Sequence, residues 1–158
     1  MSLSIRPIAE DDYAFVISRL DEWWGGRDMV AKLPRLFFEH LGDAGLIAED
    51  DGRVVGFLAG FMSTAKPGEA YIHFVGVDPA ARGKGVGREL YQRYFAASRE
   101  RGAVAVNAMT SPVNRSSVEF HRAMGFAFVP GDAEVDGISY HRDHNGPGGD
   151  AVVFRRGL

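Results

Sequence analysis

The chain contains no cysteine among its 158 residues. This absence excludes disulfide bonds, thiolate metal ligands and a cysteine nucleophile able to carry an acyl group. Basic residues are also in the minority, because 18 Lys and Arg stand against 21 Asp and Glu for a formal net charge of −3. Nucleic-acid-binding domains usually carry excess basic charge, so the composition argues against a nucleic-acid partner.

Long apolar segments are missing too. The longest strongly apolar run, Val54 to Met62, spans nine residues and includes two glycines, whereas a membrane-spanning helix needs about 20 apolar residues. Arg6 and Glu10 interrupt the N-terminal region where a signal peptide would be apolar. We therefore expect one domain over residues 1–158, a cytoplasmic location and no membrane partner.

Hydrophobic spacing and turn residues predict an α+β chain. Asp11 or Asp12 is the expected N-cap of the first helix, and Asn114 that of the last. The order of elements is antiparallel in the first half and β-α-β-α-β in the second. The expected strands are 3–7, 46–49, 53–62, 70–77, 103–110, 126–129 and 151–155, and the expected helices are 12–24, 34–41, 86–101 and 114–125.

The most informative segment lies between the strand that ends at Val77 and the helix that begins at Val86. It contains three glycines in five residues, Gly83-Lys84-Gly85-Val86-Gly87. Glycines let the chain turn with its N–H groups exposed, and the first N–H groups of the following helix favour an anion. The segment therefore predicts a phosphate site, although it fits neither the Walker A nor the Rossmann pattern.

Two motifs together carry a family resemblance. Arg82-Gly83-Lys84-Gly85-Val86-Gly87 matches R/Q-x-x-G-x-G/A, and Asn114, Ser117, Phe120, Gly125 and Phe126 match N-x-x-A/S-x-x-F/L-Y-x-x-x-G-F. In this order and spacing they resemble the GCN5-related N-acetyltransferase (GNAT) family over roughly residues 3–130. The resemblance implies a mixed twisted sheet of six to seven strands flanked by about four helices.

The same resemblance implies acetyl-CoA as co-substrate. The loop would bind the pyrophosphate, the preceding strand would pair with the pantetheine arm, and Asn107, Asn114 and Ser116 would reach the arm. Gly76 would let an N–H face the thioester oxygen, or would simply be a glycine required by packing. The implied donor-binding residues are Val75, Gly76, Val77, Arg82, Gly83, Lys84, Gly85, Val86, Gly87, Asn107, Asn114 and Ser116.

Two histidines are the candidate proton-transfer groups. His121 occupies the position where many relatives carry a tyrosine that protonates the departing thiolate, so its role as acid, base or core residue stays open. His73 is the candidate general base for the acceptor amine, or a residue that only lines the sheet. Strict alternation along the strand would place it on the same face as Val75 and Val77.

The acceptor pocket is the part of the site that the sequence predicts least well. The resemblance places this pocket between the first two helices, the central strands and the C-terminal hairpin. Aromatic residues there are also ordinary core residues. We expect no metal, because residues 140–150 show no standard ligand spacing. The candidate acceptor residues are Trp23, Trp24, Arg27, Phe37, Tyr71 and His141.

The leading hypothesis is therefore an N-acetyltransferase that moves the acetyl group of acetyl-CoA to a primary amine of a small molecule or peptide. With no cysteine to carry an acyl intermediate, direct attack in a ternary complex fits best. Two alternatives stay open, a non-catalytic acyl-CoA sensor of the same fold and a transferase for another acyl group. A homodimer is also left open.

Overall fold

The computed structural model describes residues 2–158. The strands are β1 (Leu3–Pro7), β2 (Leu46–Asp50), β3 (Arg53–Met62), β4 (Glu69–Val77), β5 (Ala105–Thr110), β6 (Ala127–Phe128), β7 (Ala133–Val135), β8 (Ile138–Tyr140) and β9 (Val152–Gly157). The α-helices are α1 (Asp12–Trp23), α2 (Leu36–Glu39), α3 (Val86–Glu100) and α4 (Arg115–Ala123), with short 3₁₀ turns η1 (Val30–Lys32), η2 (Gly42–Ala44) and η3 (Pro79–Ala81).

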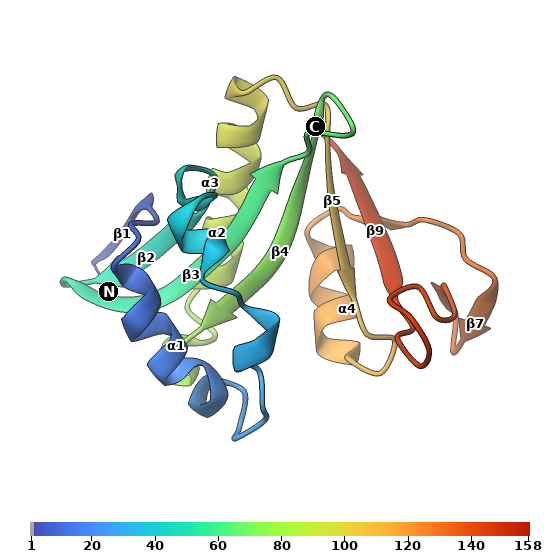
Figure 1. The fold of residues 1–158 in the computed structure, drawn as a ribbon, viewed down its shortest axis with the longest axis horizontal. Helices are drawn as coiled ribbons and strands as arrows, with labels where there is room; N and C mark the ends of the chain where they lie inside the picture. Colours follow the sequence, from blue (N-terminus) through green and yellow to red (C-terminus); the bar gives the residue numbers. More distant parts are fainter. Residues whose placement is uncertain (1) are drawn as a thin grey trace.

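Seven strands form one mixed sheet in the order β1-β2-β3-β4-β5-β9-β6, and β7 and β8 form a separate hairpin. All pairings in the large sheet are antiparallel except β4 with β5, which is parallel. In Figure 1, α1 and α2 lie on one face of the sheet, and α3 and α4 lie on the other. The predicted α+β class, strand number and helix number are confirmed.

Each face of the sheet has its own core. Val86 and Leu90 of α3 and Phe154 of β9 belong to the core on the α3 and α4 side. Val16 and Leu20 of α1 and Phe57 of β3 belong to the core on the opposite side. The alternation along β3 supplies both layers, because successive side chains of a strand point to opposite faces.

Local chemistry explains the boundaries that sequence reasoning located. Asp51 and Gly52 both have positive φ, as a two-residue hairpin turn between β2 and β3 requires. Asn114 caps α4, since its side chain accepts a hydrogen bond from Ser117 N. The second helix is shorter than the expected 34–41, since α2 covers only Leu36–Glu39 and the separate turns η1 and η2 lie before and after that range. The hairpin β7–β8 was not predicted, since its strands have only three residues each.

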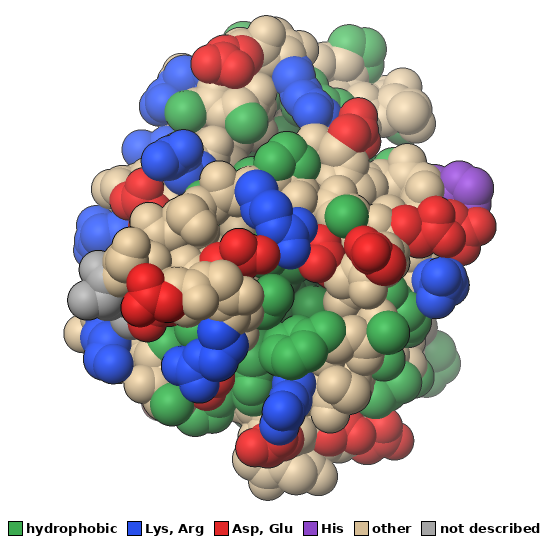
Figure 2. Space-filling view, turned by 90° about the vertical axis from the view of Figure 1, so that its left-hand side faces the viewer, with side chains coloured by type: hydrophobic (Ala, Val, Ile, Leu, Met, Phe, Trp, Pro, Cys, Tyr) green, Lys and Arg blue, Asp and Glu red, His purple; other side chains and the backbone are tan. Residues whose placement is uncertain are grey.

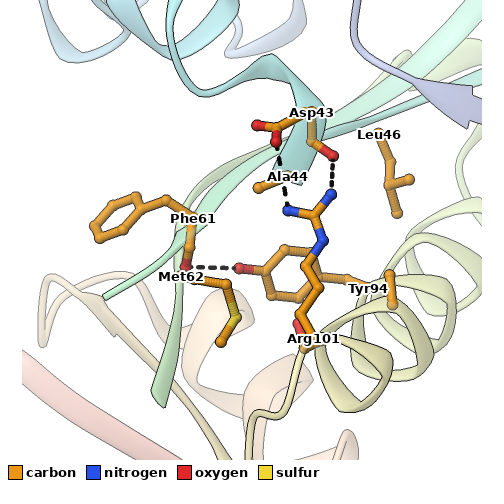
Figure 3. A pocket seen from close by; sticks show the side chains of 9 residues that line it. Asp43, Ala44, Leu46, Phe61, Met62, Tyr94 and Arg101 are labelled. Atoms are coloured by element: carbon orange, nitrogen blue, oxygen red, sulfur yellow. Dashed lines mark hydrogen bonds and ion pairs between the residues drawn. The ribbon is translucent and has the colours of Figure 1, made fainter. Parts of the chain in front are cut away.

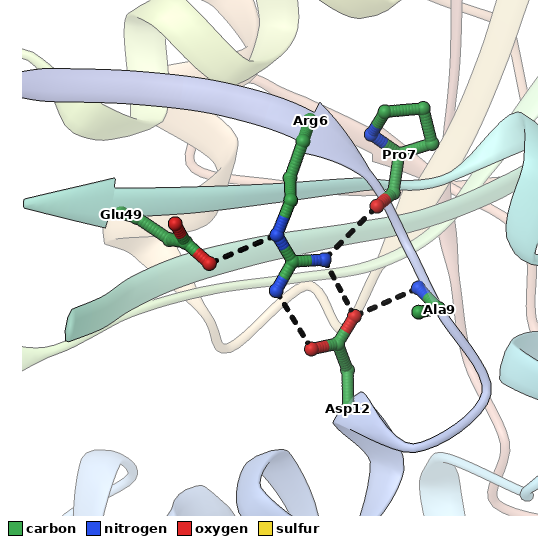
Figure 4. A network of polar contacts seen from close by, with 5 residues as sticks. All are labelled: Arg6, Pro7, Ala9, Asp12 and Glu49. Atoms are coloured by element: carbon green, nitrogen blue, oxygen red, sulfur yellow. Dashed lines mark hydrogen bonds and ion pairs between the residues drawn. The ribbon is translucent and has the colours of Figure 1, made fainter. Parts of the chain in front are cut away.

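The N-cap of α1 is Asp11, one of the two expected residues, but the side-chain cap bond is missing. Asp12 instead accepts two hydrogen bonds from Arg6, at 2.8 Å each, and one from Ala9 N at 2.7 Å. Arg6 also bonds Glu49 of β2 at 2.8 Å (Figure 4). This network ties α1 to β1 and β2 at the edge of the sheet. On the face of the molecule drawn in Figure 2, acidic and basic side chains are interspersed.

Replacing Asp12 with asparagine is expected to lower the free energy of unfolding at neutral pH by about 1 kcal/mol. The expected loss of stability is small because the Arg6 side chain is 38% exposed, so solvent screens its attraction to Asp12. The bond from Arg6 holds the pKa of the Asp12 carboxyl below its ordinary 3.8 in the folded state. The contribution is therefore complete above that value and disappears as the pH falls through the folded pKa.

Denaturant unfolding of the wild type and D12N between pH 7 and pH 2 tests this. The stability gap should close in acid, whereas a gap that is the same at both ends would contradict the account. D11N is the matched control, because Asp11 makes no side-chain cap bond.

A bulge in β4 changes which side chains of this strand lie on each face of the sheet. Ala59 pairs with Phe74 and Gly60 pairs with Ile72, so His73 is an extra residue in the ladder. Beside the bulge, the Tyr94 hydroxyl of α3 donates to Tyr71 O at 2.8 Å or to Phe61 O at 3.2 Å, the second of which is drawn in Figure 3. A bulge reverses the alternation beyond it.

The cavity drawn in Figure 3 is not a ligand site. It has a volume of about 20 Å³, enough for a single water molecule. Arg101 at the end of α3 donates to Asp43 O of η2 at 2.7 Å across its rim. Its residues therefore serve to hold α3 against the sheet.

Candidate functional site: a cleft between two diverging strands

A large cleft of about 960 Å³ opens beside the end of β4. Its position follows from the pairing of β4 with β5, which covers only Glu69–Tyr71 on the β4 side. Beyond Tyr71 the two strands diverge (Figure 1). The cleft is lined by Trp23, Trp24, Gly25 and Arg27 after α1, by Val75, Gly76 and Val77 of β4, by Ala81, Arg82, Gly83, Gly85, Val86, Gly87, Arg88 and Tyr91 around the start of α3, and by Asn114, Ser116, Ser117, Phe120 and His121 of α4.

The edge of β4 in the cleft has chemical consequences. Among residues 2–158, no strand pairs with the β5-facing edge of β4 beyond Tyr71. Backbone N–H and C=O groups on such an edge need partners. A ligand that carries amide groups can supply them by lying along the strand as an additional strand would.

The glycine loop has the geometry that anion binding requires. Gly83 and Gly85 have φ of +75° and +83°, values that L side chains rarely adopt. No atom lies within 4 Å of an ideal Cβ at either position, so both face open space. Gly85 is the N-cap of α3, whose first N–H groups lack helical partners and carry the positive end of the helix dipole.

Arg82 lines the cleft, and its guanidinium bonds two backbone carbonyls. Its Nη2 donates to Trp23 O at the end of α1 at 2.6 Å, and its Nε donates to Val77 O at the end of β4 at 3.2 Å. Trp23 and Val77 both line the cleft. Arg82 therefore fastens two of the walls to each other.

Replacing Arg82 with alanine is expected to cost about 2 kcal/mol of folding free energy, because two charge-assisted bonds to backbone carbonyls are lost. R82K should recover less than half of this, since one ammonium group cannot reproduce the forked geometry of a guanidinium. Thermal or denaturant unfolding measures both variants. K84A is the control on the same loop, and wild-type stability in R82A would contradict the role.

Two of the predicted donor-binding residues are not brought to the cleft. Lys84 is exposed and is not among the lining residues. Asn107 lies on β5, where its Nδ2 donates to Glu69 Oε1 at 3.0 Å beside Arg155. The strands are still paired at that level, so the amide faces a polar cluster and not the opening.

The predicted residues of α4 do reach the cleft. Asn114 and Ser116 both line it, and Ser116 Oγ lies 3.3 Å from Asn114 Oδ1. Asn114 also caps α4 through Ser117 N. The capping role and a position at the cleft are thus compatible, as one side chain serves the helix start that borders the opening.

His121 lines the cleft but is 6% exposed. Its Nδ1 lies 2.7 Å from Ser117 O, which only accepts, so Nδ1 carries the proton. Nε2 then accepts from the Tyr91 hydroxyl at 3.0 Å. Burial lowers the pKa of His121 below 6.5, and its ring stacks on Phe154 at 4.7 Å. The imidazole is therefore held neutral with both nitrogens engaged, which disfavours it as a ready proton donor.

Gly76 is required by packing. An ideal Cβ there would lie 2.5 Å from Phe57 Cε1 and 2.8 Å from Trp24 Cη2. Trp24 also contacts Phe74 with a ring-centroid distance of 5.0 Å. The absence of a side chain at Gly76 thus lets α1 close onto β4 and shape the cleft wall.

The expected face of His73 is wrong, because the bulge reverses the alternation. Val75 and Val77 pack on the α3 side, whereas the His73 ring stacks on Phe37 of α2 at 4.0 Å with an interplanar angle of 2°. His73 Nε2 donates to Lys32 O at 2.7 Å. Burial lowers the pKa of His73 below 6.5 despite that bond. No hydrogen bond to Nδ1 comes from residues 2–158, so one nitrogen of a neutral ring is free to accept a proton.

The candidate acceptor residues fall into three groups. Trp23, Trp24 and Arg27 line the cleft. Phe37 and Tyr71 both contact Phe61, so they lie with His73 on the α2 side of the sheet. His141 is placed elsewhere, with its Nε2 bonded to Val129 O at 3.1 Å near the C-terminal hairpin. The structure does not bring His141 into contact with either of the other groups.

Sequence reasoning did not assign six of the lining residues to a site: Gly25, Ala81, Arg88, Tyr91, Ser117 and Phe120. Helical spacing from Gly87 offered a signal, because Arg88 and Tyr91 occupy the first turns after the glycine loop. Of the residues that the structure describes, no three His, Asp or Glu side chains form a group suited to a metal ion. Over the same residues, no helix is long and apolar enough to cross a membrane.

Comparison with known proteins shows which family the chain resembles. The model of the acetyltransferase (GNAT) family matches residues 8–126. L-2,4-diaminobutyric acid acetyltransferase of Nocardia farcinica is 33% identical over 79 residues, which cover 50% of this chain and 41% of that protein. Mycothiol acetyltransferase of Thermomonospora curvata is 36% identical over 104 residues, covering 65% and 33%. The chain thus spans less than half the length of these two relatives.

A solved structure supports the same assignment at the level of the fold. The PaiA N-acetyltransferase of Thermoplasma acidophilum, in complex with coenzyme A, superposes with a TM-score of 0.72 at 15% identity, covering all of both chains. The family match extends over most of the sequence and includes the loop and the strand that border the cleft. The chain belongs to the GNAT family of acetyltransferases.

Proposed function

We propose that this protein is an N-acetyltransferase that transfers the acetyl group of acetyl-CoA to a primary amine by direct attack in a ternary complex. The observation that carries the proposal is the free edge of β4 in a cleft that ends at the glycine loop. Pantetheine amides suit the strand edge, and a pyrophosphate suits the loop and the start of α3. Relatives named as acetyltransferases and a GNAT neighbour solved with coenzyme A support the choice of donor.

The thioester would lie beside Val75–Val77, where a backbone N–H polarises its carbonyl oxygen. The acceptor would approach from the α2 side of the sheet, where His73 has a free nitrogen. An amine such as lysine's has a pKa near 10.4 and must lose its proton before it attacks. His73 accepts that proton, the nitrogen–carbon bond forms, and the carbon–sulfur bond breaks with its electron pair on sulfur. The thiolate then takes up the second proton, which the nitrogen releases as it becomes an amide nitrogen.

Release of free CoA thiol from acetyl-CoA in the presence of amines tests the function. The panel contains diaminobutyrate, methionine sulfoximine and a short peptide with a free N-terminus, since relatives and neighbours act on small-molecule or protein amines by name. Amine-dependent release supports the proposal. Tight acetyl-CoA binding with no release for any amine would favour the non-catalytic sensor instead.

A further inference from the structure

The cleft differs from the rest of the chain in its charge. The chain carries 21 Asp and Glu, yet of the residues described, no carboxylate side chain lines the cleft. Within residues 2–158, the charged side chains that line it are three arginines, Arg27, Arg82 and Arg88. A concave site with charges of one sign favours a ligand of the opposite sign.

The three arginines are not equivalent. The guanidinium of Arg82 is engaged with Trp23 O and Val77 O. Neither Arg27 nor Arg88 makes a side-chain hydrogen bond or ion pair to residues 2–158 in the structure. The hydrogen bond from Arg82 to Trp23 O holds the end of α1 against the start of the glycine loop. Arg27 lies in the turn that follows α1. Arg88 lies in the first turn of α3, directly after the last glycine of the loop.

We infer that Arg27 and Arg88 form a clamp on the phosphate groups of the donor, with one guanidinium from each of two separate segments. The inference rests on the proposed function. Arg27, a candidate acceptor residue by sequence, is thereby assigned to the donor. The charged contacts with phosphate are assigned to Arg27 and Arg88 instead of Arg82 and Lys84. A planar guanidinium donates two parallel hydrogen bonds to a phosphate, which suits it to this role.

Calorimetric titration with three ligands of decreasing charge tests the clamp. The ligands are CoA, 3′-dephospho-CoA and pantetheine, and the proteins are the wild type, R27Q, R88Q and the control K84Q. R27Q and R88Q should each weaken CoA binding about 10- to 100-fold, whereas K84Q should change it less than about twofold. Neither arginine variant should alter pantetheine binding, because that ligand has no phosphate.

The 3′-dephospho-CoA arm distinguishes the two phosphate sources. A variant that loses affinity for CoA but not for 3′-dephospho-CoA has lost a contact with the 3′-phosphate, and one that loses both has lost a contact with the pyrophosphate. CoA affinity within about twofold of wild type in R27Q or R88Q would overturn that residue's part in the clamp while leaving the proposed function intact. Failure of the wild type to bind CoA would instead overturn the proposed function itself.

Discussion

H73Q is expected to lower kcat by about 100-fold or more while leaving acetyl-CoA affinity unchanged, as loss of a positioned general base does. The reason lies in the bulge of β4, which turns His73 toward α2 and away from the donor-lining valines. There its Nε2 is fixed on Lys32 O, and a lone pair remains on Nδ1. Glutamine keeps a polar side chain of similar length but does not accept a proton at neutral pH.

The pH dependence of kcat/KM supplies a second readout. Burial lowers the pKa of His73 below 6.5, so the base is deprotonated at neutral pH and activity should fall as the pH drops through that lowered pKa. H73Q should lose this acidic limb. H40Q is the matched control, because His40 is 72% exposed at the end of α2. Near wild-type kcat in H73Q would exclude His73 as the base.

G76A is expected to cost about 3 kcal/mol of folding free energy and to weaken donor binding. The added Cβ would lie within 3 Å of atoms of both Phe57 and Trp24, so packed aromatic rings must move, and overpacking of this kind costs up to about 3 kcal/mol. Trp24 lines the cleft, and its displacement changes the wall along which the donor lies.

G87A is the matched control for stability. An ideal Cβ at Gly87 lies 3.5 Å from Phe120, an ordinary contact, and Gly87 is inside α3, where alanine is favoured over glycine by about 1 kcal/mol. G87A should therefore unfold at the same or a higher denaturant concentration than the wild type. Equal stability of G76A and the wild type would show that the rings do not hold Gly76 in place.

The sequence predicted the elements whose signals are local. The glycine loop and the cap at Asn114 depend on residues within a few positions of one another. The fold class followed from the order of such elements, and the two motifs were sufficient for the family. The family model and the seven-stranded mixed sheet confirm both.

What the sequence did not predict depends on contacts between distant residues. The face on which His73 lies is decided by a bulge in β4, beside which Tyr94 of α3 donates a hydrogen bond to Tyr71 O. A prediction from strict alternation does not include that long-range contact. Gly60 was an available signal, since a glycine inside a strand often marks a bulge. The engagement of Arg82 with Trp23 O spans 59 positions, and the polar cluster that holds Asn107 joins three strands. Charge and motif position alone assigned these side chains to the ligand.

The central claim is that the cleft beside β4 is a donor site for acetyl-CoA. Calorimetric titration of the wild-type protein with acetyl-CoA, with ATP and NAD as controls, tests it most directly. The account predicts one acetyl-CoA bound per chain and much weaker binding of the two nucleotides, which offer phosphates to the loop but no pantetheine amides to the free edge of β4. Equal affinity for ATP and acetyl-CoA, or no binding of any acyl-CoA, would contradict it.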